Sequence, residues 1–290
     1  MKIVFVTPEM EPLVKVGGLA DVVSALSLEL ARTGDEVSVV MPRYSGINIP
    51  RGGMKDTGVT ISVPLDGGVW KGTVSTYRHD GVLVYLVENP EFFEREGTYG
   101  VDGTDYTDNA LRFAFLARGA LEVSKALHLE PDIFHIHDWQ TALLPVFKNL
   151  YYQEEKEIGR AGVVMSIHNL AYQGLFGSEF VTRLGLPWDI FNLQGLEFYG
   201  QLSFLKGGLV YSDLLTTVSP TYAKEIQTPE YGAGLHGLLR QRVDVLVGIL
   251  NGIDTSVWNP ETDGDLFAPY SAGDLSGKAK NKKCLQALLG

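Results

Sequence analysis

Polar and aromatic side chains directly follow an apolar segment that has the composition of a buried strand. The motif is His135-Ile136-His137-Asp138-Trp139. Alternate residues of a strand point to opposite faces, so His135 and His137 share one face. Ligands of open α/β sheets bind beyond the carboxyl ends of the strands. Asp138 and Trp139 could therefore present a hydrogen-bonding group and a flat aromatic surface to a sugar. The two histidines could form a metal pair, although no further ligand lies at a useful spacing. The alternative is that both are core residues hydrogen-bonded to backbone.

A second motif, Ile167-His168-Asn169-Leu170-Ala171-Tyr172-Gln173-Gly174, follows the next expected strand, Val163–Ile167. It combines imidazole, amide and phenol groups in one loop. This set is suited to recognising hydroxyl groups rather than to abstracting a proton. The alternative is that Asn169 only bonds its own backbone. Both strand ends therefore carry groups that could contact the hydroxyls of a sugar.

A glycine pair opens the first expected helix, in Lys15-Val16-Gly17-Gly18-Leu19-Ala20-Asp21-Val22. It follows strand Ile3–Val6, and the helical pattern continues to Arg32. A strand, a glycine pair and a helix present backbone N–H groups to an anion, and Lys15 adds a positive charge. The spacing differs from the Gly-x-Gly-x-x-Gly of dinucleotide enzymes, which disfavours a nicotinamide oxidoreductase. A plain turn remains the alternative.

Weaker signals occur at Tyr99-Gly100 and at Asn251-Gly252-Ile253-Asp254, which follows the last expected strand. Asp263-Gly264-Asp265 resembles a metal-binding Asp-x-Asp but lies outside the sheet pattern. Lys206-Gly207-Gly208 falls within a helical pattern and is expected to be a site of close packing.

Strands and helices alternate along the chain, which predicts an α/β fold. We expect a Rossmann-like, mainly parallel sheet with helices on both faces. Three consecutive β-rich segments predict a meander added to that sheet. The expected strands are Ile3–Val6, Glu36–Met41, Val59–Val63, Val69–Tyr77, Val82–Val87, Ile133–His137, Val163–Ile167, Leu214–Val218 and Val245–Leu250. The expected helices after the first are Thr107–Leu127, Thr141–Tyr152, Leu202–Tyr211 and Pro220–Ile226.

Composition narrows the class of partner. The 290 residues are 45% hydrophobic and carry a net charge of −11, which argues against nucleic acid as the main partner. A single cysteine, Cys284, fits a reducing compartment. The first apolar run is four residues long and soon meets Glu9 and Glu11, so it predicts a strand rather than a signal peptide. No apolar run approaches the ~20 residues that span a bilayer. We expect a cytoplasmic protein with no membrane partner.

The composition changes after Asn259-Pro260. Gly, Asp and Ser dominate, and a basic helical segment with Lys278, Lys280, Lys282 and Lys283 follows. We expect a Rossmann-like catalytic domain over residues 1–260. Residues 261–290 would be a junction that leads toward a second domain.

These motifs, in their order and spacing, resemble those of the bacterial glycogen synthase and plant starch synthase family, which uses ADP-glucose. The matching segments lie between Lys2 and about Asn259. They are Lys15–Val22, Tyr106–Asn109, His137–Trp139, His168–Gly174, Val218–Tyr222 and Leu250–Asp254.

The resemblance implies the N-terminal half of a glycosyltransferase built from two Rossmann-like domains. Glucose would pass from ADP-glucose to the non-reducing end of an α-1,4-glucan, with retention of configuration and with no metal or other cofactor. The implied roles divide the candidate residues into three groups. They are the reaction centre (His168 and Asp138), the donor contacts (Lys15, Gly17, Gly18, Asn169 and Asn251) and the acceptor contacts (Tyr99 and Trp139).

In this family the C-terminal domain supplies the arginine and lysine that clamp the diphosphate, and most of the adenosine pocket. Residues 1–290 contain none of these, so we expect the isolated domain to be inactive. A glucan-binding module without transfer activity is the main alternative. A related glycosyltransferase or phosphorylase that acts on another donor is a third.

Overall fold

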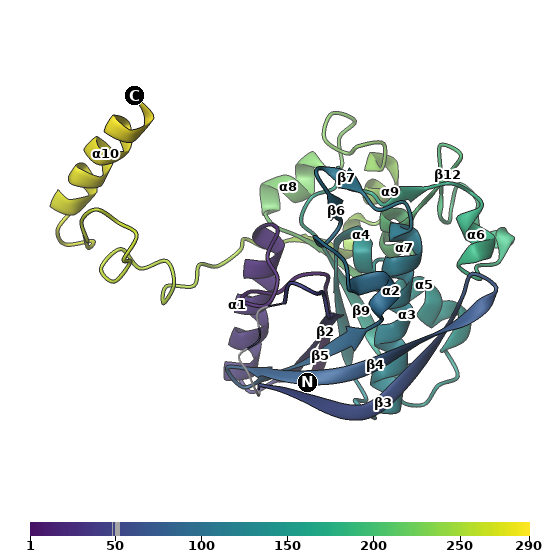
Figure 1. Cartoon of the computed structure of the whole chain (residues 1–290). Helices are drawn as coiled ribbons and strands as arrows, with labels where there is room; N and C mark the ends of the chain where they lie inside the picture. Colours follow the sequence, from purple (N-terminus) through teal and green to yellow (C-terminus); the bar gives the residue numbers. More distant parts are fainter. Residues whose placement is uncertain (48, 50–52) are drawn as a thin grey trace. The chain divides into compact units, whose positions relative to one another are not determined.

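The first part of the chain is organised around a mixed β-sheet (Figure 1). The computed structural model describes residues 1–47, 49 and 53–290, and these form two units, residues 1–250 and 251–290. Within the described residues, nine strands make up the main sheet. In order across the sheet they are β14 (Leu246–Gly248), β13 (Leu214–Thr217), β9 (Gly162–Ile167), β8 (Ile133–His137), β1 (Lys2–Val6), β2 (Glu36–Pro42), β5 (Val82–Glu88), β4 (Gly68–His79) and β3 (Met54–Leu65).

The strands from β14 to β5 are parallel, and β4 runs antiparallel to both β5 and β3. Asp80 and Gly81, with φ of 44° and 98°, form the tight turn between β4 and β5. The predicted meander on a parallel sheet is therefore confirmed.

Strand β1 occupies the position at which the order of the parallel strands reverses. It pairs with β2 on one side, Lys2 opposite Glu36, and with β8 on the other, Ile3 opposite Ile133. The chain first builds outward from β1 through β2 to β5, and later from β8 through β9 to β14. Adjacent loops at such a reversal diverge to opposite faces of the sheet and leave room for a ligand. The segment after β1 that ends in Lys15-Val16-Gly17-Gly18 is called the glycine loop. The segment after β8 begins with Asp138.

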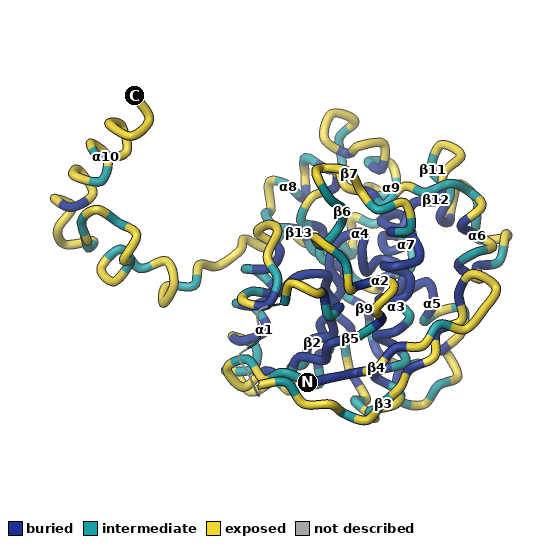
Figure 2. Tube along the Cα trace, in the orientation of Figure 1, coloured by how far each residue is buried: buried dark blue, intermediate teal, exposed yellow. Residues whose placement is uncertain are grey.

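Helices cover both faces of the sheet. On one face, α1 (Gly18–Arg32) packs Leu19 and Val23 against Phe5 and Val39. The other face is covered chiefly by α3 (Asn109–Ala126), whose Phe113 belongs to the larger core cluster. Figure 2 shows that α3 and the central strands are buried over most of their length. The predicted fold class is confirmed.

One predicted helix, Thr141–Tyr152, is divided in two. The structure has α4 (Asp138–Thr141) and α5 (Leu144–Tyr151). Pro145 lies in the first turn of α5, where its missing N–H costs nothing, whereas inside a continuous helix it would remove a hydrogen bond. Predicted helix Leu202–Tyr211 begins instead at α7 (Phe204–Tyr211), because Ser203 accepts a hydrogen bond from Lys206 N as its N-cap.

Shorter elements connect these main ones. They are α2 (Pro90–Phe93), β6 (Gly100–Val101), β7 (Thr104–Asp105), β10 (Leu175–Phe176), α6 (Phe180–Arg183), η1 (Trp188–Ile190), β11 (Glu197–Phe198), β12 (Gln201–Ser203), α8 (Pro220–Glu225), α9 (His236–Gln241) and η2 (Val243–Val245).

The second unit, residues 251–290, ends in α10 (Ser276–Leu289), which confirms the predicted basic helix. Asn281 fixes the preceding loop, since its side chain bonds both Ala268 N and Ala268 O, at 2.9 and 2.8 Å. The unit begins at Asn251, earlier than the predicted boundary at residue 260. Throughout the described residues, no helix has the length and apolar character needed to cross a membrane.

Close packing of α7 depends on a glycine, as the sequence predicts. A Cβ added at Gly208 would lie 2.5 Å from Met165 Sδ and 2.8 Å from Ala142 Cβ. We expect Gly208→Ala to lower the free energy of unfolding by about 1–3 kcal/mol, because overpacking forces neighbours to move.

Denaturant unfolding of purified variants measures this effect. Gly237→Ala, in α9, is the matched control, since an added Cβ there meets open space. It should leave stability unchanged or raise it by up to about 1 kcal/mol. Equal effects of the two substitutions would contradict the packing explanation.

Candidate active site

The loops after β8 and β9 are joined by one carboxylate. Asp138 directly follows β8, and its Oδ1 accepts hydrogen bonds from His168 N at 2.8 Å and Asn169 N at 3.5 Å. The backbone of Asp138 has a φ of 52°, a conformation that non-glycine residues rarely adopt and that is often found at functional sites. The structure thus brings together the predicted residues Asp138, His168 and Asn169.

Burial controls the charge of Asp138. Its side chain is largely removed from solvent, and this raises its pKa to about 7. Hydrogen bonds from His168 N and Asn169 N act in the opposite direction, and the negative charge of Glu9 adds to the increase. Near neutral pH the carboxyl group is present in both forms, so it can accept a hydrogen bond or donate one.

Three histidine rings form a row beside this carboxylate. His135 and His137 stack at 4.5 Å between ring centroids, as the period of the strand predicts. His137 Nδ1 lies 3.0 Å from His168 Nε2, and His135 Nε2 lies 2.7 Å from Ser166 Oγ. The two strand histidines are therefore core residues, but they bond to side chains rather than to backbone.

Burial lowers the pKa of His135 and of His168 to about 4, and that of His137 well below its usual value. Repulsion between the rings adds to the effect on His135 and His137. The row is neutral at physiological pH. His168 can then exchange hydrogen bonds with hydroxyl groups, but it does not supply a positive charge.

The glycine loop lies beyond the carboxyl end of β1. Gly17 and Gly18 are exposed where α1 begins, and Gly17, its N-cap residue, has an extended backbone. Lys15 Nζ lies 2.6 Å from Asp21 Oδ1, and both side chains are about 40% exposed (43% and 39%). An exposed pair of this kind contributes little to stability, so Lys15 remains available to an incoming anion.

Tyr99 lies close to this loop. Its hydroxyl donates to Glu9 Oε1, and its backbone carbonyl accepts from Asn109 Nδ2 at 2.9 Å. Val16 and Tyr99 line the same hollow, of about 240 Å³, together with the β6–β7 hairpin. Desolvation by burial raises the pKa of Tyr99 well above its usual value, so its hydroxyl remains protonated.

The structure corrects the prediction for Trp139. The side chain is 9% exposed, and its ring packs against Phe113, Phe176 and Phe204, at 5.0, 5.8 and 6.3 Å between centroids. Gly174 closes the remaining side, since a Cβ there would lie 2.4 Å from Trp139 Cε3. A ring enclosed in this way has no free face for a sugar. The sequence placed Trp139 near the strand end correctly, but α4 directs the side chain into the core.

Two other predicted contacts have local partners. Asn169 Oδ1 accepts from Ala171 N at 3.0 Å, which is the self-bonding turn that the sequence left open. Asp263 Oδ1 likewise accepts from Asp265 N at 2.9 Å. Asn251 is the first residue of the second unit, and its donor contact stays a prediction.

The sequence analysis assigned no role to three residues of this site. Glu9 is buried and contacts both the glycine loop and Tyr99. Asp21 pairs with Lys15, and the hydroxyl of Tyr222 accepts from Leu170 N at 3.1 Å. A carboxylate placed three residues after a buried strand was the available signal for Glu9. Among the residues that the structure describes, no three His, Cys, Asp or Glu side chains are grouped as a metal site would require.

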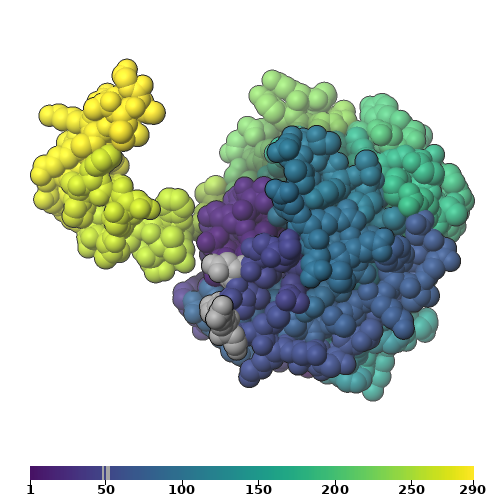
Figure 3. All heavy atoms as spheres, viewed as in Figure 1, coloured from purple at the N-terminus to yellow at the C-terminus, as the bar shows by residue number. Residues whose placement is uncertain are grey.

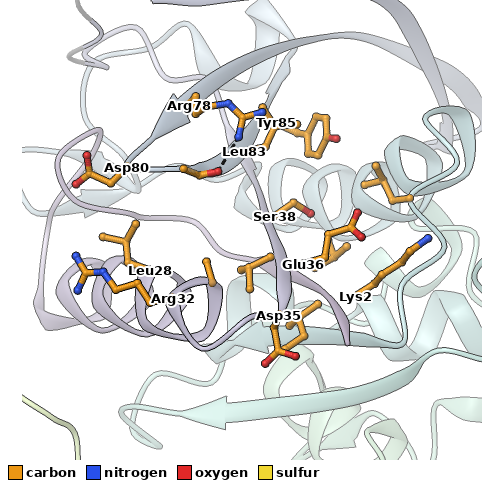
Figure 4. Close-up of a pocket in the computed structure, with 16 residues that line it drawn as sticks. Lys2, Leu28, Arg32, Asp35, Glu36, Ser38, Arg78, Asp80, Leu83 and Tyr85 are labelled. Atoms are coloured by element: carbon orange, nitrogen blue, oxygen red, sulfur yellow. Dashed lines mark hydrogen bonds between the residues drawn. The ribbon is translucent and has the colours of Figure 1, made fainter.

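A separate groove of about 450 Å³ lies at the amino ends of β1, β2 and β5 (Figure 4). Its charged residues are of both signs: Lys2, Arg32 and Arg78 stand beside Asp35, Glu36 and Asp80. Arg78 Nη1 donates to Gly81 O within the groove, at 2.7 Å. The groove is at the opposite end of the sheet from Asp138 and the glycine loop, so it is not part of the candidate active site.

Comparison with known proteins agrees with this geometry. The family model of the starch synthase catalytic domain matches residues 2–241. The chain is 43% identical over 290 residues to a glycogen synthase of Geotalea uraniireducens and 48% identical over 293 residues to one of Anaeromyxobacter sp. strain Fw109-5. Each match covers the whole chain and 60% of the relative.

A solved structure is also similar. It is the catalytic domain of starch synthase IV from Arabidopsis thaliana bound to ADP and acarbose, with a TM-score of 0.88 and 34% identity. The match covers 99% of this chain and 59% of that one.

The fold and the family model define a glycosyltransferase catalytic domain of the GT-B type. The chain belongs to the starch and glycogen synthase family. It spans about 60% of the length of the curated relatives that it matches.

The raised pKa of Asp138 predicts a pH-dependent stability. The carboxyl titrates near 3.8 in an unfolded chain and near 7 in the fold, so ionisation across this interval destabilises the folded state. Asp138→Asn keeps an oxygen that can accept from His168 N but cannot ionise. The Tm of Asp138→Asn minus the Tm of wild type should increase as the pH rises from about 4 to about 8. At pH 8 the variant should have a Tm at least about 2 °C above that of wild type.

Thermal unfolding followed by circular dichroism tests this expectation. The exposed Glu154 provides the control, since Glu154→Gln removes a charge without relieving burial. A Tm difference for Asp138→Asn that does not change with pH would contradict the assignment of a buried, ionising carboxyl group.

Proposed function

We propose that this chain is the acceptor-side catalytic domain of an enzyme that transfers glucose from ADP-glucose to the non-reducing end of an α-1,4-glucan. The observation that carries the proposal is that the glycine loop and the Asp138–His168 pair follow the adjacent strands β1 and β8 at the strand-order reversal, in a chain of this family. The starch synthase IV domain, which holds ADP and acarbose together, supports a nucleotide-sugar donor and a glucan acceptor.

The donor phosphates would bind at the start of α1. This end of the helix offers unpaired N–H groups and a partial positive charge, both of which favour an anion. Lys15 lies just before it and would add a full charge. A phosphate has more charge than the carboxylate of Asp21, so Lys15 would change partner when the donor binds.

The transferred glucose would lie next to Asp138, His168 and Asn169. A neutral His168 fits the recognition of sugar hydroxyls, and Asp138 is already committed through Oδ1 to two backbone N–H groups. Asp138 is therefore better suited to hydrogen bonding than to forming a covalent glycosyl intermediate. This arrangement supports same-face transfer with retention, in which the backbone at His168 faces the developing positive charge.

Tyr172, rather than the buried Trp139, is the aromatic residue that we propose to contact the glucan acceptor. Tyr172 lies in the same loop as His168 and is 66% exposed, so its ring has a free face for stacking on a sugar. A glucan-binding module without transfer activity remains the second candidate, because this exposed ring would bind a glucan with or without a donor. We also infer a cytoplasmic location from the composition.

We expect an enzyme that contains this domain, joined to the C-terminal portion present in its relatives, to transfer labelled glucose from ADP-glucose to glycogen in EDTA. Residues 1–290 alone should incorporate no label, since transition-state charge stabilisation by the second domain is worth roughly 100-fold or more per donor group. Label that requires added divalent metal would contradict metal-free transfer. Label incorporated by residues 1–290 alone would contradict the division of the site between two domains.

Lys15 provides a sharper test in the same enzyme. We expect Lys15→Ala to lower kcat/KM for ADP-glucose by at least about tenfold, or about 1.4 kcal/mol. Its Tm should hardly change, because exposed substitutions usually alter stability by less than about 0.5 kcal/mol. Lys156→Ala, at an exposed position away from the loop, is the control. Wild-type kinetics in Lys15→Ala would remove Lys15 from the donor site.

A further inference from the structure

A buried carboxylate occupies the N–H groups that precede α1. Glu9 is 4% exposed, and its Oε2 accepts from Val16 N at 2.6 Å and Gly17 N at 3.1 Å. The backbone at Glu9 is itself held by Thr7, whose hydroxyl bonds Glu9 N and Glu9 O at 3.3 and 2.7 Å. A buried carboxylate is tolerated only when such partners replace water. These contacts fix the turn that ends in the glycine pair.

The second carboxylate oxygen connects this turn to a distant segment. Glu9 Oε1 accepts from the hydroxyl of Tyr99, which is 90 residues away in the chain. The peptide of Tyr99 is anchored on both sides: Asn109 Nδ2 donates to Tyr99 O at 2.9 Å, and Arg112 Nη2 donates to Thr98 O at 3.0 Å. The position of Glu9 is therefore set by α3.

Arg112 makes this anchor rigid. Its guanidinium group is fully buried and donates to Phe92 O at 2.6 Å and Asn109 Oδ1 at 2.7 Å, as well as to Thr98 O. Loss of any of these partners would leave a buried, charged donor unsatisfied, which is strongly unfavourable. A continuous set of hydrogen bonds thus runs from α3 through Tyr99 and Glu9 to the glycine loop.

These contacts limit where an anion can bind. Val16 N and Gly17 N already donate to Glu9, so they are not available to a ligand, which would instead meet N–H groups such as those of Gly18 and the residues after it. Figure 3 shows the first helix and the segment near residue 100 as neighbours on the molecular surface, and Val16, Tyr99 and Gly100 line one hollow there. The carboxylate of Glu9 would repel a nearby phosphate. Its presence beside the glycine loop is therefore explained by the backbone geometry that it imposes on Val16 and Gly17.

We propose that Glu9 is a positioning residue for the donor. It orients the start of α1, through Val16 and Gly17, so that the free N–H groups and Lys15 point at the donor phosphates. The proposal rests on the proposed function, because the donor is the nucleotide sugar assigned there. Glu9 acts through the loop and does not touch the donor. Misplacing such a group by about 1 Å can lower the rate roughly 100-fold.

Three substitutions separate the geometry from the charge. Glu9→Gln keeps an oxygen for Val16 N and Gly17 N, and the hydroxyl of Tyr99 can then accept from the new amide. Glu9→Ala removes all of these contacts. Glu11→Gln is the matched control, since it removes a negative charge two residues away in the same loop without altering the Val16 and Gly17 contacts.

Hydrogen exchange of the whole chain, resolved at the amides of Val16 and Gly17, measures the ordering of the loop without a catalytic assay. We expect exchange at these amides to be at least about tenfold faster in Glu9→Ala than in wild type, and nearly unchanged in Glu9→Gln and Glu11→Gln. Unchanged exchange in Glu9→Ala would overturn the proposal. If Glu9→Ala does not fold, Tyr99→Phe decides: faster exchange than wild type supports the proposal and wild-type exchange overturns it.

Kinetics in the transferring enzyme then distinguish a positioning role from a purely structural one. Glu9→Ala should lower kcat/KM for ADP-glucose at least about tenfold and leave KM for glycogen near the wild-type value, and Glu9→Gln should stay within about threefold of wild type. Values for Glu9→Ala equal to those for Glu11→Gln, or a change confined to KM for glycogen, would overturn the proposal. A wild-type enzyme that does not use ADP-glucose would instead refute the proposed function, and the exchange measurement would still decide whether Glu9 orders the loop.

Discussion

The pairing of β1 with two neighbours, β2 and β8, is the constraint on which the rest of the molecule depends. Parallel pairing aligns the carboxyl ends of these strands at one edge of the sheet. Because the strand order reverses beside β1, the following segments separate to opposite faces, with α1 on one and α4 on the other. The glycine loop and Asp138 therefore follow adjacent strands at the point where such a reversal leaves room for a ligand. Parts of the chain more than 100 residues apart in sequence thereby contribute to one site.

The electrostatics of this site follow from burial rather than from composition. The chain has a net charge of −11, and Glu9, Asp21 and Asp138 all lie near the carboxyl ends of β1 and β8. Each carboxylate has specific partners: backbone N–H groups for Glu9 and Asp138, and Lys15 for Asp21. The histidine row is kept neutral by desolvation. In the proposed function, a neutral sugar would therefore meet uncharged imidazole rings, and Lys15 would supply positive charge to the phosphates.

Aromatic packing provides the rigidity that such a site requires. Trp139 and its three aromatic neighbours fill the space behind the Asp138 loop, and the missing side chain of Gly174 allows the indole to approach the backbone closely. Arg112 has a similar function for the segment that contains Tyr99. From α3 it donates hydrogen bonds to Phe92 O and Thr98 O, and these hold that segment against the helix. Both residues act on the loops from behind. They hold in place the groups that would face a ligand.

The sequence by itself determined the fold class, the meander and the three loops that carry the site. These features depend on local patterns: the period of the strands, the glycine pair before a helix, and polar groups directly after apolar runs. The stacking of His135 and His137 follows from the same period. Only the tertiary structure decided that Trp139 is buried, that His137 bonds His168, and that Glu9 joins the glycine loop to Tyr99. Periodicity assigns a residue to a face, but the partners on that face come from segments 30 to 90 residues away. Their approach is set by how helices and loops pack on the sheet, which no local pattern encodes.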